Sequence, residues 1–197
     1  MSQQPLHIVA LSGSLRKQSY NTKLLHNAAQ FLPPNLTFTL ADLSQIPMYN
    51  EDLESDLPQA VTQFAELCRS ADGVLISTPE YNGQISGVLK NALDWVSRAY
   101  LLTPLALKPV AIMGATKGNG GTSQAQTNLR QLLFSLNMEP VNRPVLQVSQ
   151  AHTKFDEAGQ FTDAHGKEIL EKLVHNLAAK VVKHKNEQQE AAASASR

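Results

Sequence analysis

The sequence lacks a long apolar run, and no stretch approaches the roughly 20 apolar residues that a membrane-spanning helix requires. Its N-terminus lacks the basic flank and apolar stretch of a secretory signal, so we expect a cytoplasmic protein without a membrane span. It has one cysteine, Cys68, which excludes an intrachain disulfide. Cys68 shares a predicted helical face with Val61, Phe64 and Ala65, so we expect a buried core thiol rather than a reactive one.

An excess of charge of either sign is also missing, because 17 Lys and Arg residues balance 17 Asp and Glu residues. No basic stripe is interleaved with aromatic residues, so nucleic-acid binding is not expected. The 6 histidines are scattered without a spacing such as H-E-x-x-H, and no metal site is predicted. A chain of 197 residues that is 42% hydrophobic is typical of one globular domain.

Short apolar runs that are typical of buried parallel strands recur along the chain. They lie at 6–12, 36–41, 73–78, 109–113 and 145–148. Segments with helical spacing alternate with them at 22–32, 57–71, 86–99, 121–136 and 163–183. This alternation predicts an α/β fold, an open doubly wound sheet of five parallel strands with helices on both faces. Ligands of such sheets bind beyond the carboxyl ends of the strands.

Two segments fall outside this alternation. Residues 42–56 form a long irregular connection, which is either functional or a simple surface excursion. The segment from His184 onward is low in complexity. We therefore predict a domain over 1–183 and a disordered tail over 184–197.

The loop after the first predicted strand, GSLRKQSYNT from Gly13 to Thr22, opens a helix. It matches neither G-x-G-x-x-G nor G-x-x-x-x-G-K-[ST], so a dinucleotide or a nucleoside triphosphate is not expected. Short side-chain donors, a guanidinium group and the free N–H groups of a helix start suit a compact phosphomonoester dianion instead. An alternative stays open, in which Ser19 or Asn21 simply caps the helix. The candidate phosphate-binding side chains are Ser14, Arg16, Ser19, Asn21 and Thr22.

A second unusual loop, Pro79-Glu-Tyr-Asn-Gly83, follows the third predicted strand. Its backbone N–H groups from Glu80 to Gly83 can face the edge of a heteroaromatic ring, and Tyr81 can supply a flat wall. The alternative is a plain helix-entry turn with Asn82 or Ser86 as the cap. A glycine-rich loop over 114–121 follows the fourth predicted strand, at the same end of the sheet.

Two motifs, GSLRKQSYNTKLL and PEYNGQISGVLKNALDWVSR, in this order and spacing resemble the NADPH-dependent FMN reductase family of flavodoxin-like proteins. That family includes bacterial quinone, azo-dye and chromate reductases. The resemblance covers roughly residues 6–150 and takes in DLSQIPMYNEDLE and KPVAIMGATKGNGG. Two positions depart from it, since Gln18 stands where glycine is common and Leu107 precedes Lys108 where glycine is expected.

The resemblance implies a flavodoxin-like fold with non-covalently bound FMN, and NADPH or NADH as the co-substrate. It places the FMN phosphate on the first loop and the isoalloxazine ring against the second, with the 114–121 loop nearby. The cofactor-binding residues that it implies are Ser14, Arg16, Ser19, Asn21, Thr22, Pro79, Glu80, Tyr81, Asn82, Gly83, Thr116, Gly118 and Gly121.

The function implied by the resemblance is transfer of hydride from the nicotinamide to FMN, and then of electrons to quinone, azo, flavin or metal-oxyanion acceptors. The flavin carries this chemistry, so we nominate no catalytic side chain and give Glu80 little weight as a base. One alternative is a non-enzymatic FMN electron carrier of flavodoxin type, although such carriers usually present a strongly acidic docking face. Another is a ligand sensor or scaffold that has lost turnover.

The predicted helix over 86–99 carries two apolar stripes, although packing against one sheet requires only one. Ile85, Leu89, Leu93 and Val96 form the first, and Val88, Ala92, Trp95 and Ala99 form the second. We therefore predict a homodimer or a tetramer of dimers, with Trp95 at or beside a subunit contact. The alternative is a helix that its own chain buries more deeply.

Overall fold

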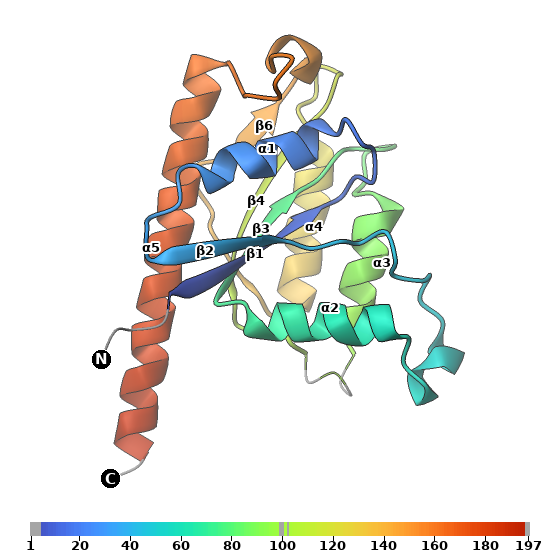
Figure 1. Ribbon diagram of the computed structural model, residues 1–197, viewed down its shortest axis with the longest axis vertical. Helices are drawn as coiled ribbons and strands as arrows, with labels where there is room; N and C mark the ends of the chain where they lie inside the picture. The colour runs from blue at the N-terminus through green and yellow to red at the C-terminus, as the bar shows by residue number, and fades with distance from the viewer. Residues whose placement is uncertain (1–4, 99–100, 102, 196–197) are drawn as a thin grey trace.

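The computed structural model describes residues 5–98, 101 and 103–195, and its centre is a parallel sheet (Figure 1). The strand order is β2-β1-β3-β4-β5, and β6 also pairs with β4. The predicted doubly wound α/β sheet is confirmed. The strands are β1 (Leu6–Ser12), β2 (Leu36–Leu40), β3 (Gly73–Ser77), β4 (Pro109–Ala115), β5 (Glu139–Pro140) and β6 (Leu146–Val148).

The outermost position of the sheet is shared by two short strands. β5 pairs with Pro109 and Val110 at the start of β4, and β6 pairs with 113–115 at its end. Pro140 and Pro144 lie in or between these strands, and proline lacks the N–H that a continuous ladder requires. The sequence predicted only the second of the two strands.

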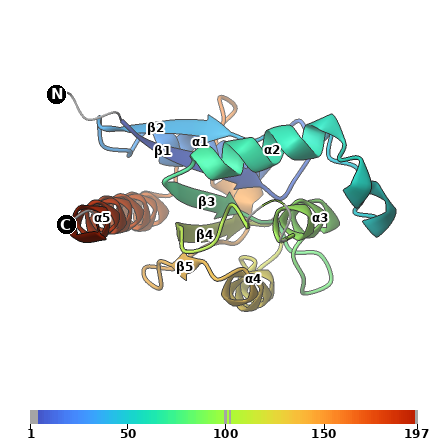
Figure 2. The ribbon, with the colours of Figure 1, turned by 90° about the horizontal axis from the view of Figure 1, so that it is seen from below.

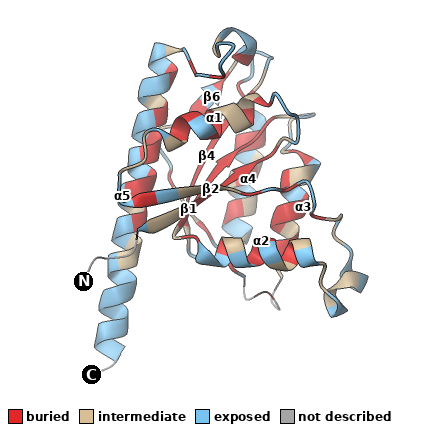
Figure 3. Ribbon diagram, viewed as in Figure 1, coloured by how far each residue is buried: buried red, intermediate tan, exposed pale blue. Residues whose placement is uncertain are grey.

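Helices cover both faces of the sheet. Side chains of α2, α3 and α4 pack on one face, and side chains of α1 and α5 pack on the other. Figure 2 shows α5 on one side of the strands, and α3 and α4 on the other. The inner faces of these helices are buried (Figure 3). The helices are α1 (Tyr20–Ala29), α2 (Gln59–Ser70), α3 (Gly87–Val96), α4 (Ser123–Ser135) and α5 (Ala164–Ala195), with short 3-10 turns η1 (Glu51–Ser55) and η3 (Ala151–Thr153).

The C-terminal segment differs from the prediction of a disordered tail, because α5 continues as a helix to Ala195. Residues 184–195 are rich in Glu, Gln and Ala, which are strong helix formers. The Nζ atom of Lys185 also lies 2.8 Å from the Asp72 carboxylate, which joins the extension to the body of the protein. Residues 186–195, which follow this contact, are exposed (Figure 3).

The prediction that Trp95 itself lies at a subunit contact is wrong, because Trp95 is completely buried by its own chain. A subunit contact beside Trp95 stays a prediction. The 42–56 connection covers it: Trp95 Nε1 donates to the Pro47 carbonyl at 2.8 Å, and the Tyr49 ring meets the indole edge-on at 5.0 Å. Trp95 therefore faces this connection, whereas Val88 of the same stripe is only partly buried. Ala99 lies outside the described residues.

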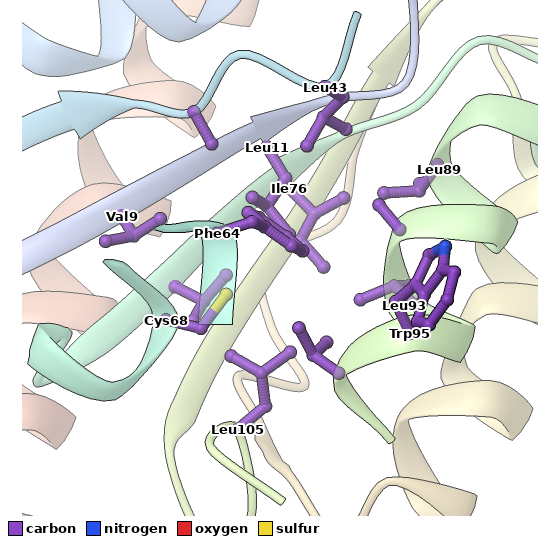
Figure 4. Close-up of a cluster of buried hydrophobic side chains, with 14 of the residues drawn as sticks. Val9, Leu11, Leu43, Phe64, Cys68, Ile76, Leu89, Leu93, Trp95 and Leu105 are labelled. Atoms are coloured by element: carbon purple, nitrogen blue, oxygen red, sulfur yellow. The ribbon is translucent and has the colours of Figure 1, made fainter. Parts of the chain in front are cut away.

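Cys68 lies in the core between α2 and the sheet, as predicted (Figure 4). Burial raises the pKa of its thiol to about 12. Among the described residues, no helix combines the length and the apolar character that a membrane crossing requires.

Candidate functional site

The loops that follow β1, β3 and β4 meet at the carboxyl edge of the sheet, because these strands are neighbours and parallel. Between the loops lies a cavity of about 190 Å³. A larger groove of about 660 Å³ runs beside the C-terminal half of α5. We assign the site to the smaller cavity, because polar groups from three loops converge there at the strand ends. Its lining residues are Ser14, Arg16, Ser19, Tyr20, Asn21, Pro79, Glu80, Tyr81, Ala115, Thr116 and Lys117.

The first loop presents an anion site at the start of α1. Ser19 caps the helix by accepting a hydrogen bond from the Thr22 N–H at 3.3 Å, and no described residue accepts a hydrogen bond from its hydroxyl group. Within the described part of the chain, the backbone N–H groups of Tyr20 and Asn21 have no acceptor. They lie at the positive end of the α1 dipole, beside Ser14 and the exposed Arg16.

The side chains of Asn21 and Thr22 hold α1 in place, a role that differs from the predicted one. Asn21 Oδ1 accepts from the Ala115 N–H and from the Ser77 hydroxyl, both at 2.9 Å, and its Nδ2 donates to the Ala115 carbonyl at 3.0 Å. The Thr22 hydroxyl shares a hydrogen bond of 2.8 Å with the Ser12 hydroxyl. Asn21 can therefore reach a ligand through its backbone N–H, whereas the Thr22 N–H is already bonded to Ser19.

The loop after β3 forms a tight hairpin. Tyr81 and Gln84 exchange two backbone hydrogen bonds of 3.0 Å. Asn82 and Gly83 between them have φ values of 54° and 72°, as a type I′ turn requires. The cap of α3 is Ser86, which accepts from the Leu89 N–H at 3.2 Å.

The hairpin leaves groups free for a ligand. The Tyr81 side chain lines the cavity, and the residue is 53% exposed. The backbone N–H groups of Glu80, Asn82 and Gly83 have no acceptor among the described residues. The hairpin also lies against the first loop, because a Cβ atom at Gly13 would approach Pro79 Cδ to 2.8 Å.

The Glu80 carboxylate points toward the start of helix α4. Its Oε2 accepts a hydrogen bond of 2.9 Å from the Ala125 N–H, in the first turn of α4. Asn128, on the next turn, donates to the Gly83 carbonyl at 2.8 Å. The hairpin is therefore attached to α4 at both of these residues.

The loop after β4 contributes Thr116 to the cavity wall, whereas Gly118 and Gly121 do not line it. The Gly118 carbonyl accepts from the Gln150 N–H at 3.0 Å. Gly121 has a φ of 59°, and a Cβ atom there would lie 2.9 Å from Gln147. Both glycines shape the loop.

Sequence reasoning missed Tyr20, Ala115 and Lys117, which also line the cavity. Tyr20 and Lys117 directly follow the predicted residues Ser19 and Thr116. That adjacency was the available signal, since neither residue type by itself indicates a ligand.

The donor set of the cavity fits a phosphomonoester attached to a flat ring. Free N–H groups, hydroxyls and a guanidinium suit the phosphate, and Tyr81 with the free N–H group of Glu80 suits a ring edge. Asn82 and Gly83, whose N–H groups are also free, lie just outside the cavity lining. A volume of about 190 Å³ is smaller than that of a typical complete ligand pocket. The cavity therefore suits the phosphate end of such a ligand, with the ring lying at the open side by Tyr81.

Comparisons with known proteins identify the family to which the chain belongs. The family model for NADPH-dependent FMN reductase matches residues 6–153. The chain is 43% identical over 173 residues to an NAD(P)H-dependent FMN reductase of Pseudomonas aeruginosa, covering 87% of this chain and 93% of the relative. It is 36% identical over 174 residues to a 2-hydroxy-1,4-benzoquinone reductase of a Burkholderia species, covering 88% and 95%. The solved structure of FerB, a flavoenzyme NAD(P)H:(acceptor) oxidoreductase from Paracoccus denitrificans, aligns with a TM-score of 0.83 at 31% identity, covering 91% of this chain and 98% of FerB.

Proposed function

Since the chain belongs to the NADPH-dependent FMN reductase family, we propose that the cavity at the carboxyl edge of its sheet is the FMN site. Family membership makes the chain an FMN-dependent NAD(P)H oxidoreductase. The assignment of the site rests on one observation above all. The unpaired N–H groups at the start of α1 share a cavity with Ser14, Arg16 and Ser19, directly beside the 79–84 hairpin.

The proposed contacts divide between the two ends of FMN. Ser14, Arg16 and Ser19, with the N–H groups of Tyr20 and Asn21, hold the phosphate. Tyr81 and the N–H groups of the hairpin hold the ring, and Thr116 and Lys117 close the third side. The residues of this site are Ser14, Arg16, Ser19, Tyr20, Asn21, Pro79, Glu80, Tyr81, Asn82, Gly83, Thr116 and Lys117.

Bound FMN would supply the hydride-accepting and electron-donating chemistry. The chain supplies binding, orientation and charge stabilisation. The unpaired N–H groups of Glu80, Asn82 and Gly83 can stabilise negative charge on a neighbouring ring without a proton transfer. The Glu80 carboxylate is bonded to α4, so we assign no side chain as an acid or a base.

We propose quinones as the electron acceptors. The open side of the cavity at Tyr81 can admit a second flat ring, and relatives from Burkholderia and Pseudomonas putida are named as quinone reductases. The test is steady-state oxidation of NADPH and NADH by the purified holoprotein with quinones, azo dyes, free FMN, chromate and ferric chelates. We expect the highest kcat/KM with a quinone. Slow flavin reduction by both nucleotides would instead favour the flavodoxin-type carrier.

We also propose a homodimer or tetramer in the cytoplasm. The assembly is supported by large side chains exposed near the carboxyl edge of the sheet: Leu15, Met48 and Tyr81 are 53%, 75% and 53% exposed to solvent. The cytoplasm is supported by the unpaired Cys68, which suits a reducing compartment. Light scattering should give at least twice the mass of one chain. A monomeric mass at micromolar concentration would contradict the assembly.

A further inference from the structure

Helix α4 begins without a cap of its own. Its N-cap residue, Thr122, has a left-handed backbone with a φ of 69°, and its side chain forms no capping hydrogen bond. The first turn of α4 contains no acidic residue. At the same edge of the sheet, α1 and α3 are capped by their own serines, Ser19 and Ser86. The start of α4 therefore needs an acceptor from outside the helix.

Glu80 supplies that acceptor from the 79–84 hairpin. Its Oε2 accepts from the Ala125 N–H at 2.9 Å, and its Oε1 lies 3.8 Å from the position of a Cβ atom at Gly120. The carboxylate thus covers the first turn of α4. A negative charge at this end of a helix also interacts favourably with the helix dipole.

A second contact holds the tip of the hairpin against α4. Asn128 Nδ2 donates to the Gly83 carbonyl at 2.8 Å. Asn128 lies three residues after Ala125, on the same helical face. A Cβ atom at Gly83 would lie 2.4 Å from Gln124 Oε1, so the turn packs closely on the helix. With one link at Glu80 and another at Gly83, the hairpin cannot rotate independently of α4.

We propose that Glu80 is a positioning residue for the flavin ring. By joining the hairpin to α4, it keeps Tyr81 and the unpaired N–H group of Glu80, which belong to the cavity lining, in one arrangement. The unpaired N–H groups of Asn82 and Gly83, which follow directly in the same turn, are fixed with them. Glu80 acts through a hydrogen bond and takes no part in proton transfer. This inference rests on the proposed FMN site and deepens it.

The test compares Glu80→Ala, which removes the acceptor, with Glu80→Gln, which keeps an oxygen acceptor without the charge. Glu171, an exposed acid on α5, gives the matched control Glu171→Ala. Three properties are measured: amide hydrogen exchange at Tyr81 and Gln84 in the flavin-free protein, affinity for FMN and for riboflavin, and the pH profile of kcat.

In Glu80→Ala, we expect faster exchange at both amides and about 10-fold weaker binding of FMN and riboflavin alike, since one cap contact is lost. The FMN-to-riboflavin affinity ratio should not change, because the phosphate loop is intact. Glu80→Gln should restore exchange and affinity to within about threefold, with the pH profile of the wild type. The control should match the wild type throughout.

Other outcomes overturn the proposal. If kcat falls as far in Glu80→Gln as in Glu80→Ala, and the pH profile of kcat also loses one limb, Glu80 is an acid or a base. If Glu80→Ala leaves exchange and riboflavin affinity unchanged, Glu80 positions nothing. If wild-type protein binds neither flavin, the proposed FMN site itself fails, whereas the exchange measurement on flavin-free protein still reports whether Glu80 holds the hairpin.

Discussion

At the scale of single residues, the first loop divides its polar side chains between two tasks. Arg16 is exposed and lines the cavity, and no described side chain or carbonyl accepts a hydrogen bond from its guanidinium group. Asn21 is buried and bonds to the ends of β3 and β4. The two residues lie five positions apart, yet replacing Arg16 should weaken FMN binding, whereas replacing Asn21 should lower the stability of the fold.

Arg16→Ala should weaken FMN binding about 10- to 150-fold, the effect of losing a charge-assisted hydrogen bond to phosphate. Riboflavin affinity should change little, because riboflavin has the same ring without the phosphate. Fluorescence titration of both flavins measures the ratio, and Lys17→Ala on the neighbouring exposed residue is the control. An equal loss for both flavins would mean that Arg16 acts through loop structure, and no loss would mean that it points into water.

Asn21→Ala should lower the free energy of unfolding by ~2–4 kcal/mol, because it leaves the Ala115 N–H and the Ser77 hydroxyl without their partner in a buried place. Urea unfolding of the apoprotein measures this. Thr22→Val, which removes only the bond to Ser12, should cost about 1 kcal/mol. An unchanged urea midpoint in Asn21→Ala would show that these bonds do not hold α1 to the sheet.

Cys68 should make stability fall at alkaline pH. Its folded pKa is raised from the ordinary 9.0 to about 12, so above pH 9 the unfolded chain loses a proton that the folded chain keeps. The buried, protonated thiol therefore contributes fully to the free energy of unfolding below pH 9. This contribution is lost as the pH rises toward 12, by up to ~1.4 kcal/mol per pH unit. In denaturant titrations between pH 8 and 10.5, the difference in stability between the wild type and Cys68→Ala should be nearly constant below pH 9 and should fall with this slope above it. Parallel curves would contradict the raised pKa.

At the scale of elements, the 42–56 connection serves as a cover for α3. Asn91 of α3 accepts from the Tyr49 N–H at 2.7 Å and donates to the Pro47 carbonyl at 2.8 Å. Trp95 donates to the same carbonyl, and its ring is buried beneath the connection. Trp95, the largest side chain of the stripe that suggested a subunit contact, is thus buried within its own chain.

The single tryptophan reports on this cover. Trp95 emission should be at short wavelength and should not move on dilution to nanomolar protein, because residues of its own chain bury the ring completely. Asn91→Ala should shift the emission to longer wavelength, since it removes both Asn91 bonds to the cover. A shift of the wild-type emission on dilution would show instead that Trp95 lies at a subunit contact.

At the scale of the whole molecule, three loops from neighbouring parallel strands line one cavity, the proposed FMN site, at one edge of the sheet. The donor and the acceptor should therefore occupy the same open face in succession. Double-reciprocal plots of initial rate at several quinone concentrations should give parallel lines, the pattern of a ping-pong reaction. Intersecting lines would mean that NADPH and quinone bind together, which needs a second pocket beside the first.

The sequence by itself determined the alternation of strands and helices, apart from β5, and the burial of Cys68. It also singled out the three loops that meet at the candidate site. These follow from local patterns, because apolar periodicity sets the elements and parallel strands bring their carboxyl ends to one edge. The motifs in the first two loops also carried the family resemblance, which the family match bears out.

Only the tertiary structure decided what individual side chains do. Asn21 and Glu80 lie in the predicted loops, but their partners, Ala115 and Ala125, are 94 and 45 residues away in the chain. The partner of Trp95, Pro47, is 48 residues away. A hydrogen bond between distant segments leaves no periodicity in the sequence, so a ligand donor, a helix cap and a cover contact look alike there until folding brings the segments together.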